Sequence, residues 1–127
     1  MKIQESAENY LEAILVLQNR NGTVRSIDVA GYMGFSKPSV SIAMKHFREE
    51  EYITVDAEGN LFLTEKGRAV AEKIYERHTV IAALLIQLGV SPDTAYEDSC
   101  KIEHDLSDET FSKLKEHYVK HKFHTTI

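Results

Sequence analysis

Apolar residues recur with the period of an α-helix along most of the chain. The first predicted helix begins at Ser6, its expected N-cap, and ends near Asn19. Its apolar stripe comprises Tyr10, Leu11, Ile14, Leu15 and Leu17. A second, shorter helix is predicted over Ile27–Met33, with Ser26 as its N-cap and Gly34 just beyond its end. Both patterns indicate a helical start to the protein.

A third helix is predicted directly after a short break. Ser36 is its expected N-cap, and Pro38 lies in the first turn, where the missing N–H of a proline costs little. Its buried face follows the i, i+3, i+4, i+7 spacing and comprises Val40, Ala43, Met44 and Phe47. Two short helices separated by Gly34-Phe35 are typical of a helix-turn-helix.

A hairpin and three further helices complete the pattern. Two β-type runs, Tyr52–Val55 and Leu61–Leu63, flank a turn-rich segment and predict a two-stranded wing. The later helices are predicted over residues 64–89, over 91–105 and from 107 to a fraying tail at 117–127. We therefore predict a mainly α fold, with a winged helix-turn-helix domain over residues 1–70 and a helical domain over residues 71–127.

The composition is ordinary for a soluble globular protein. Of the 127 residues, 43% are hydrophobic and 28% are charged. The longest apolar stretch, Thr79–Leu88, is too short to span a bilayer, and the first residues lack the apolar core of a secretory signal. The single cysteine, Cys100, permits no internal disulfide. We expect a cytoplasmic protein without a membrane partner.

The net charge of −5 argues at first against nucleic-acid binding, which usually leaves a basic footprint. The charge is unevenly distributed, however. Residues 20–48 carry five basic side chains and only one acidic side chain, Asp28, so this segment has a net charge of +4. The acidic surplus lies in Glu49-Glu50-Glu51 and in the last fifty residues. One face of the first domain can therefore bind phosphate, with weak background affinity.

The third predicted helix presents side chains that suit DNA. Hydroxyl groups and a helix N-terminus favour phosphate oxygens, and short side chains let a helix enter the major groove. The candidate DNA-binding residues are Arg25, Ser36, Lys37, Pro38, Ser39, Ser41, Ile42 and Lys45. Taken alone, this segment is equally consistent with an ordinary capped amphipathic helix. The wing that follows it and the local basic charge favour DNA binding.

The segment from Cys100 to His104 carries three metal-type ligands. Cys100, Glu103 and His104 are spaced i, i+3, i+4, so their side chains should leave one face of a predicted helix. Thiolate, carboxylate and imidazole cover the ligand chemistry of Fe(II), Co(II), Ni(II) and Zn(II). Singly, the thiol would be a small buried hydrophobe and the other two a solvated helix face.

Three further residues are candidates to complete the ligand set. Asn9 and Glu12 share the polar edge of the first predicted helix, and His78 lies in the long helix. Each has a simpler interpretation: Glu12 as a surface residue and His78 as a hydrogen-bonded core histidine. The combination favours a metal, because buried carboxylates and imidazoles need partners and one ion satisfies several of them.

These residues resemble the DtxR/MntR family of metal-dependent repressors, named for the diphtheria toxin repressor and the manganese transport regulator. The resemblance covers nearly the whole chain. It is carried by Asn9-Tyr10-Leu11-Glu12, Ser36-Lys37-Pro38-Ser39-Val40-Ser41, Leu63-Thr64-Glu65-Lys66-Gly67, Arg77-His78 and Cys100-Lys101-Ile102-Glu103-His104-Asp105-Leu106-Ser107. The last of these segments is the most specific.

The resemblance implies a homodimer built from the C-terminal helices and a palindromic operator in double-stranded DNA near metal-homeostasis genes. The sequence ends before the SH3-like third domain of longer members, so we expect no such domain. It also implies a metal held between the first helix, the long helix and the Cys-Glu-His segment. The primary site would use the residues Asn9, Cys100, Glu103 and His104. A second site would use His78, with Glu12 in the manganese-type arrangement.

Several residues depart from the family pattern. The neutral Asn9 stands where members usually carry Asp or Met, and Ala82 and Tyr96 replace two ligands of the iron-type ancillary site. Ile42 stands where iron-type members often carry Gln, so no operator sequence is implied. Cys100 argues against pure manganese selectivity, since manganese prefers oxygen ligands. We expect Fe(II) or Mn(II) as the cofactor, with Co(II), Ni(II) or Zn(II) substituting in vitro.

The sequence thus predicts a metal-dependent transcriptional repressor of metal-homeostasis genes. The first rival is a metal-independent winged-helix regulator with an apolar ligand pocket near Leu84–Leu88. A small metallohydrolase is a second, but no separate general base or oxyanion donor is evident, so we expect no enzyme. A purely structural dimerisation module would leave the helix-turn-helix and wing unexplained.

Overall fold

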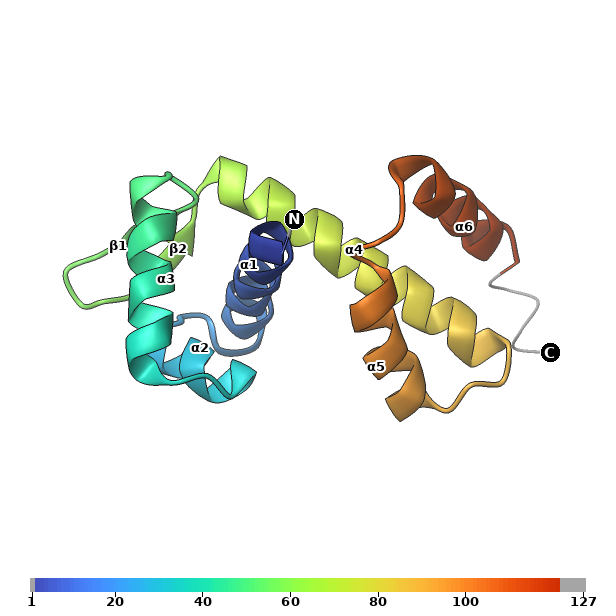
Figure 1. Ribbon diagram of the computed structural model, residues 1–127, viewed down its shortest axis with the longest axis horizontal. Coiled ribbons are helices and arrows are strands. Elements are labelled where there is room, and N and C mark those ends of the chain that lie inside the picture. The colour runs from blue at the N-terminus through green and yellow to red at the C-terminus, as the bar shows by residue number, and fades with distance from the viewer. Residues whose placement is uncertain (1, 122–127) are drawn as a thin grey trace. The chain divides into compact units, whose positions relative to one another are not determined.

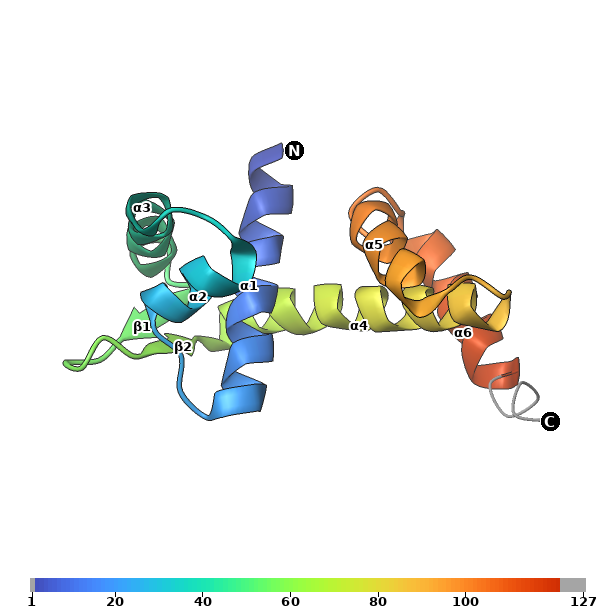
Figure 2. The same ribbon diagram turned by 90° about the horizontal axis from the view of Figure 1, so that it is seen from below.

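A computed structural model describes residues 2–121 of the chain, with side chains from Ser6 onward. The chain divides into two compact units, residues 1–73 and 74–127, and one long helix, α4 (Glu65–Gln87), belongs to both (Figures 1 and 2). Within the described residues no helix is long and apolar enough to cross a membrane.

The first unit is a winged helix-turn-helix. Its elements are α1 (Lys2–Asn21), α2 (Ser26–Met33), α3 (Lys37–Glu49), β1 (Ile53–Val55), β2 (Leu61–Leu63) and the start of α4. The strands pair antiparallel with Thr54 opposite Phe62. The loop between them extends outward in both ribbon views (Figures 1 and 2). The predicted helix-turn-helix, wing and mainly α fold are confirmed.

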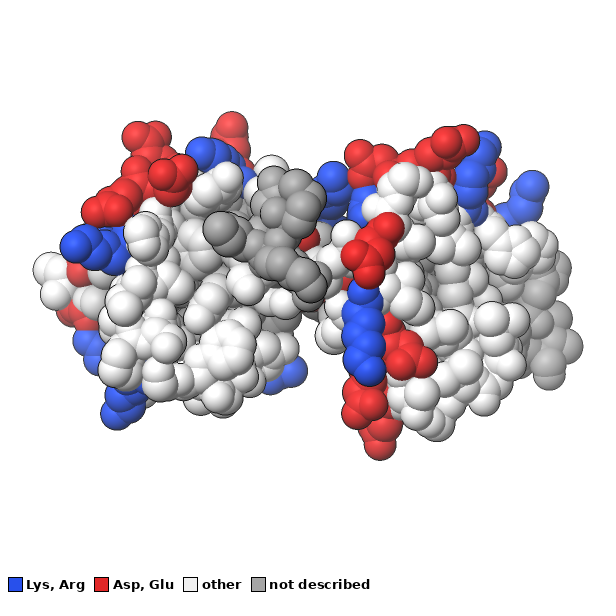
Figure 3. Space-filling view, viewed as in Figure 1, with Lys and Arg blue, Asp and Glu red and all other residues white. Residues whose placement is uncertain are grey.

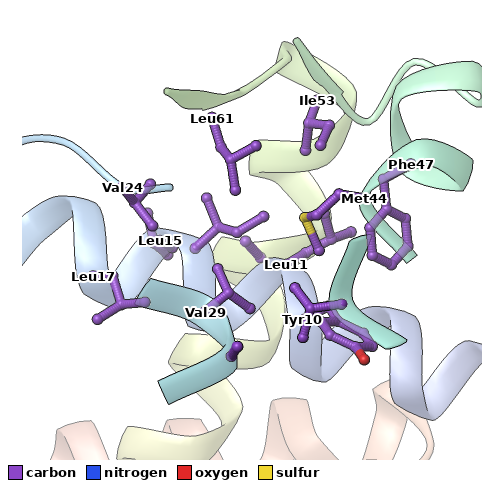
Figure 4. Packing of buried hydrophobic residues seen from close by; sticks show 14 residues of the cluster. Tyr10, Leu11, Leu15, Leu17, Val24, Val29, Met44, Phe47, Ile53 and Leu61 are labelled. Carbon is purple, nitrogen blue, oxygen red and sulfur yellow. The ribbon is translucent and has the colours of Figure 1, made fainter. Parts of the chain in front are cut away.

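The helical periods predicted the core of this unit correctly. All five residues of the α1 stripe are buried, and they pack against Val40, Met44 and Phe47 of α3 and the inward-facing strand residues (Figure 4). Leu61 N donates to the Val24 carbonyl at 2.7 Å, which ties β2 to the segment before α2. Burial also raises the pKa of the Tyr10 hydroxyl, because the phenolate would lose solvation.

Two of the expected helix starts are wrong. α1 begins at Lys2, so Ser6 lies inside the helix instead of capping it. The N-cap of α2 is Arg25, whose N–H donates to the Asp28 carboxylate at 2.9 Å. Ser26 is then the first helical residue. The cap of α3 is as predicted, since Ser39 N donates to Ser36 Oγ at 3.3 Å.

One residue in the turn after α3 has a strained backbone. Glu51 adopts φ 65°, the left-handed region, although it is not a glycine. This conformation costs a residue with a Cβ about 1–2 kcal/mol. The carbonyl of Glu51 accepts a bond from Thr64 Oγ1 at 2.7 Å, which holds the turn against the start of α4.

Glu51→Gly is therefore expected to stabilise the protein. The strain energy that glycine relieves in the folded state is larger than the free energy by which its added entropy stabilises the unfolded chain. The free energy of unfolding should therefore rise by about 0.5–1 kcal/mol. Urea unfolding followed by circular dichroism measures this change. The matched control is Glu50→Gly, at φ −86°, which should lower the stability. Equal effects of the two substitutions would contradict the strain.

The second unit packs α5 (Pro92–Ile102) and α6 (Asp108–His121) on the C-terminal half of α4 (Figure 1). Its apolar centre is formed by Val80, Ile81 and Phe111, with Leu84 and Leu85 packed against them. The apolar segment around Leu84–Leu88 therefore contributes to a packed cluster, except for the exposed Ile86 and Leu88.

The ends of these two helices differ from prediction. α5 stops at Ile102, three residues before the expected end at Asp105. α6 continues as a regular helix to His121, so the predicted fraying does not begin at His117. The rest of the predicted tail, including His124, lies outside the described residues.

Candidate DNA-binding surface and metal centre

The residues predicted for the DNA surface lie on the outer side of α3. Ser36, Lys37, Pro38, Ser39, Ser41, Ile42 and Lys45 are all exposed. Ile42, in the middle of this face, keeps 61% of its surface exposed although it is apolar. On the face shown in Figure 3, a group of acidic side chains lies over the C-terminal end of α3. A polar, weakly basic face is therefore separated from the acidic run.

Arg25 stabilises the wing. Its guanidinium donates to the carbonyl of Glu58 at the wing tip, and its backbone forms an isolated bridge with Asn60. Asp56 closes the same turn by accepting bonds from the backbone N–H groups of Glu58, at 3.0 Å, and of Asn60, at 2.8 Å. The bonds from Asn60 are the main reason that the pKa of Asp56 lies below its ordinary value.

A groove of about 220 Å³ separates α3 from the wing. Ser41, Lys45 and Arg48 line it from α3, and Ser26 lines it from the start of α2. Ser26 and Arg48 were not among the predicted DNA-binding residues. Arg48 follows Lys45 by three positions and Ser41 by seven, so helical spacing alone could have placed it on this face.

The structure brings together four of the six predicted metal ligands, all within the second unit. Cys100 Sγ lies 3.4 Å from His78 Nε2. The Glu103 carboxylate lies between two imidazoles, with Oε2 4.0 Å from His78 Nδ1 and Oε1 3.5 Å from His104 Nε2. One thiol, one carboxylate and two imidazoles thus form a contiguous cluster.

The cluster is not presented by a single helical face, as the spacing had suggested. Cys100 is on α5, but Glu103 is the C-cap residue and His104 lies in the turn that follows. Glu103 is 0% exposed and the His104 side chain is almost completely buried. Cys100, by contrast, is an exposed residue, so its interpretation as a small buried hydrophobe is wrong.

Arg77 holds this turn against α4. Its Nη1 donates to the carbonyl of Glu103 at 3.0 Å and to that of Leu106 at 2.9 Å, while Nη2 pairs with the Asp108 carboxylate. The guanidinium also lies over the ring of Phe111, 5.2 Å from its centroid. No functional role was predicted for Arg77 from the sequence. Its position next to His78 in the long helix was the available signal.

The remaining predicted ligands lie on α1, in the first unit. Glu12 is buried and Asn9 is half-buried. In the second unit, the ring of Tyr96 contacts that of His78 edge-on, with centroids 5.6 Å apart. Ala82 is buried and has no ligand atom in its side chain. At the two positions that depart from the iron-type pattern, Tyr96 therefore makes an aromatic contact and Ala82 is a buried apolar residue.

The donor set of the second unit fits a divalent transition metal. A fully buried carboxylate beside two imidazoles is costly to desolvate, and a cation offsets that cost. The thiol adds a soft ligand to this nitrogen and oxygen set. The mixture suits Fe(II), Co(II) or Zn(II) better than a hard ion such as Mg(II) or Ca(II).

Comparisons with known proteins agree with this geometry. The family model described as the iron dependent repressor N-terminal DNA binding domain matches residues 2–61. The model described as the iron dependent repressor metal binding and dimerisation domain matches residues 64–124. Both halves of the chain are thus accounted for, in the order found in that family.

Individual relatives support the same assignment. The transcriptional regulator MntR of Escherichia coli O157:H7 is 32% identical over 118 residues, which cover 93% of this chain and 76% of that protein. A helix-turn-helix regulator of Methanocaldococcus jannaschii is 33% identical over 89% of this chain and 92% of its own length. The solved structure of the manganese regulator SloR has 29% identity and a TM-score of 0.75 over 87% of this chain.

This chain spans about half the length of the SloR chain, with 52% of the latter covered. The solved structure of the metal-dependent transcriptional regulator MtsR is matched over the same share, with 27% identity and a TM-score of 0.78. The matches to the two family models and to the MntR relatives extend over nearly all of the residues that form the fold and the ligand cluster. The chain therefore belongs to the DtxR/MntR family of metal-dependent transcriptional repressors.

Proposed function

We propose that this protein is a metal-responsive repressor that binds an operator in DNA when a transition-metal ion occupies the cluster of the second unit. The observation that carries the proposal is the fully buried Glu103 carboxylate between His78 and His104. Family membership supports the same activity. The exposed polar face of α3 and the wing supply the DNA-binding surface.

His78, Cys100, Glu103 and His104 would hold the metal, and we propose Asn9 and Glu12 of α1 as further ligands. A bound divalent ion supplies positive charge and directional bonds to these donors. The donors themselves belong to elements of both units. Ligation by α1 together with the Glu103–His104 turn would restrict the orientation of the DNA-binding unit.

A restricted orientation raises DNA affinity without any new base contact. The conformational entropy of the DNA-binding unit is lost when the metal binds, so less entropy is lost when the protein binds DNA. Couplings of this kind amount to about 1–3 kcal/mol, or roughly 5–150-fold in affinity. In a homodimer on a palindromic operator, which the family suggests, the restriction would act on both recognition helices at once.

Cys100 bears on which metal is sensed. Manganese prefers oxygen ligands, whereas iron, cobalt and zinc accept a thiolate. We propose Fe(II) or Mn(II) as the physiological ion. Binding in vitro should follow the general affinity order, in which Co(II), Ni(II) and Zn(II) exceed Mn(II) and Fe(II).

The test is DNA binding by the full chain to the promoter of a metal-transporter gene, followed by fluorescence anisotropy. Titrations with a chelator, and then with Mn(II), Fe(II), Co(II) or Zn(II), are compared at one salt concentration because salt alone changes DNA affinity. We expect the affinity to rise at least about fivefold with metal. Equal affinity with chelator and with every metal would contradict the proposal.

A further inference from the structure

Arg77 is more than 90% buried, with 5% of its surface exposed, and its hydrogen bonds hold the turn between α5 and α6 and the first residue of α6. The two carbonyls that accept these bonds, those of Glu103 and Leu106, lie at the start and near the end of this turn. Its third polar contact is with Asp108, the first residue of α6. The guanidinium therefore fixes both ends of the segment that carries His104.

The position of Arg77 links this segment to the other donors. Its neighbour in the chain, His78, lies near Glu103 and Cys100. The hydrogen bond from Arg77 to the Glu103 carbonyl therefore fixes the distance between the backbone of Glu103 and helix α4, which carries His78. The carboxylate of Glu103 is on the same residue as that carbonyl, so a shift of the turn displaces the donor atoms directly.

We propose that Arg77 is a positioning residue for the metal centre: it preorganises Glu103 and His104 against α4 before the metal binds. This inference rests on the proposed function, because it presumes that the cluster binds a metal. Outer contacts of this kind typically change metal affinity by about 10–100-fold when they are removed. Arg77 reaches no donor atom itself and acts through the backbone.

The guanidinium is specifically suited to this task. A planar fork can donate to two carbonyls and a carboxylate in fixed directions and can stack on the ring of Phe111. A lysine ammonium carries the same charge but is a point donor on a flexible stem. Arg77→Lys therefore keeps the buried charge and removes the geometry.

The experiment is a Co(II) titration of the full chain, wild type and Arg77→Lys, followed by the visible absorption bands of the bound ion. We expect Arg77→Lys to bind Co(II) about 10–100-fold more weakly and, at saturation, with altered band positions or intensities. The matched control is Arg68→Lys, which changes an exposed arginine of the same helix that pairs with Glu72 at 3.4 Å. Its affinity and spectrum should equal those of the wild type.

A purely structural role would give a different result. Arg77→Lys would then lower the melting temperature of the metal-free protein but would bind Co(II) with the wild-type affinity and spectrum, which overturns the inference. Failure of the wild type to bind Co(II) would overturn the proposed function instead.

A second variant keeps the inference testable if Arg77→Lys does not fold. Asp108 is 79% exposed on its side chain, so Asp108→Asn should leave the fold intact while it weakens the hold on Arg77. We expect a loss of Co(II) affinity in the same direction as for Arg77→Lys, but smaller. Wild-type affinity in Asp108→Asn, with Arg77→Lys unfolded, would also overturn the inference.

Discussion

Glu103→Gln is expected to abolish the stabilisation of the protein by metal. Glutamine keeps the size of the side chain but removes the charge and the anionic oxygen that a cation binds. At a metal concentration of about 100 Kd, binding adds about 2.7 kcal/mol to the wild type, which raises its melting temperature by about 10 °C. The shift should be close to zero in Glu103→Gln. Thermal unfolding by circular dichroism, with chelator or with Co(II), measures it.

The control is Glu97→Gln, the same change at an exposed position of α5. It should retain the full shift with Co(II). His104→Ala removes the neighbouring imidazole and should lose both the shift and metal-dependent DNA binding while the helical content is kept. A wild-type shift in Glu103→Gln would mean that the buried carboxylate is not a ligand, and the cluster would then have a structural role.

The sequence predicts the first unit almost completely because its signals are local. The α1 stripe, the cap at Ser36 and the two β-type runs each arise within a few residues, and all are confirmed. The N-cap of α2 was predicted one residue too late, and the reason is also local. Serine is a common N-cap, but here the Asp28 carboxylate accepts the N–H of Arg25, which shifts the helix start by one residue.

The end of α5 could not be read from the sequence. No glycine or proline follows Ile102, and the i, i+3, i+4 spacing of the donors continues the helical period. The helix stops because Arg77, more than twenty positions earlier, binds the carbonyls of Glu103 and Leu106. Such a long-range contact leaves no periodic signal. Four of the candidate donors therefore lie together as the sequence suggested, but they do not share one helical face.

Gly67→Ala is expected to destabilise the first unit by about 3 kcal/mol, at the upper end of the effects of overpacking. A Cβ at this position would lie 2.0 Å from the carbonyl oxygen of Tyr52 and 3.4 Å from Leu63 Cδ2. The oxygen cannot move away easily, because it accepts a bond from Thr64 N at 3.0 Å. Urea unfolding of the wild type and the variant measures the difference.

Gly31→Ala is the matched control for this substitution. Gly31 lies within α2, and a Cβ there would meet no atom within 4 Å. Alanine is the better helix former, so this variant should be more stable than the wild type by about 0.5–1 kcal/mol. The two changes add the same methyl group with opposite expected signs. A loss of stability in both variants would point to a general intolerance of added volume. Opposite signs would assign the cost at Gly67 to its contact with the Tyr52 backbone, through which the base of the wing is held against α4.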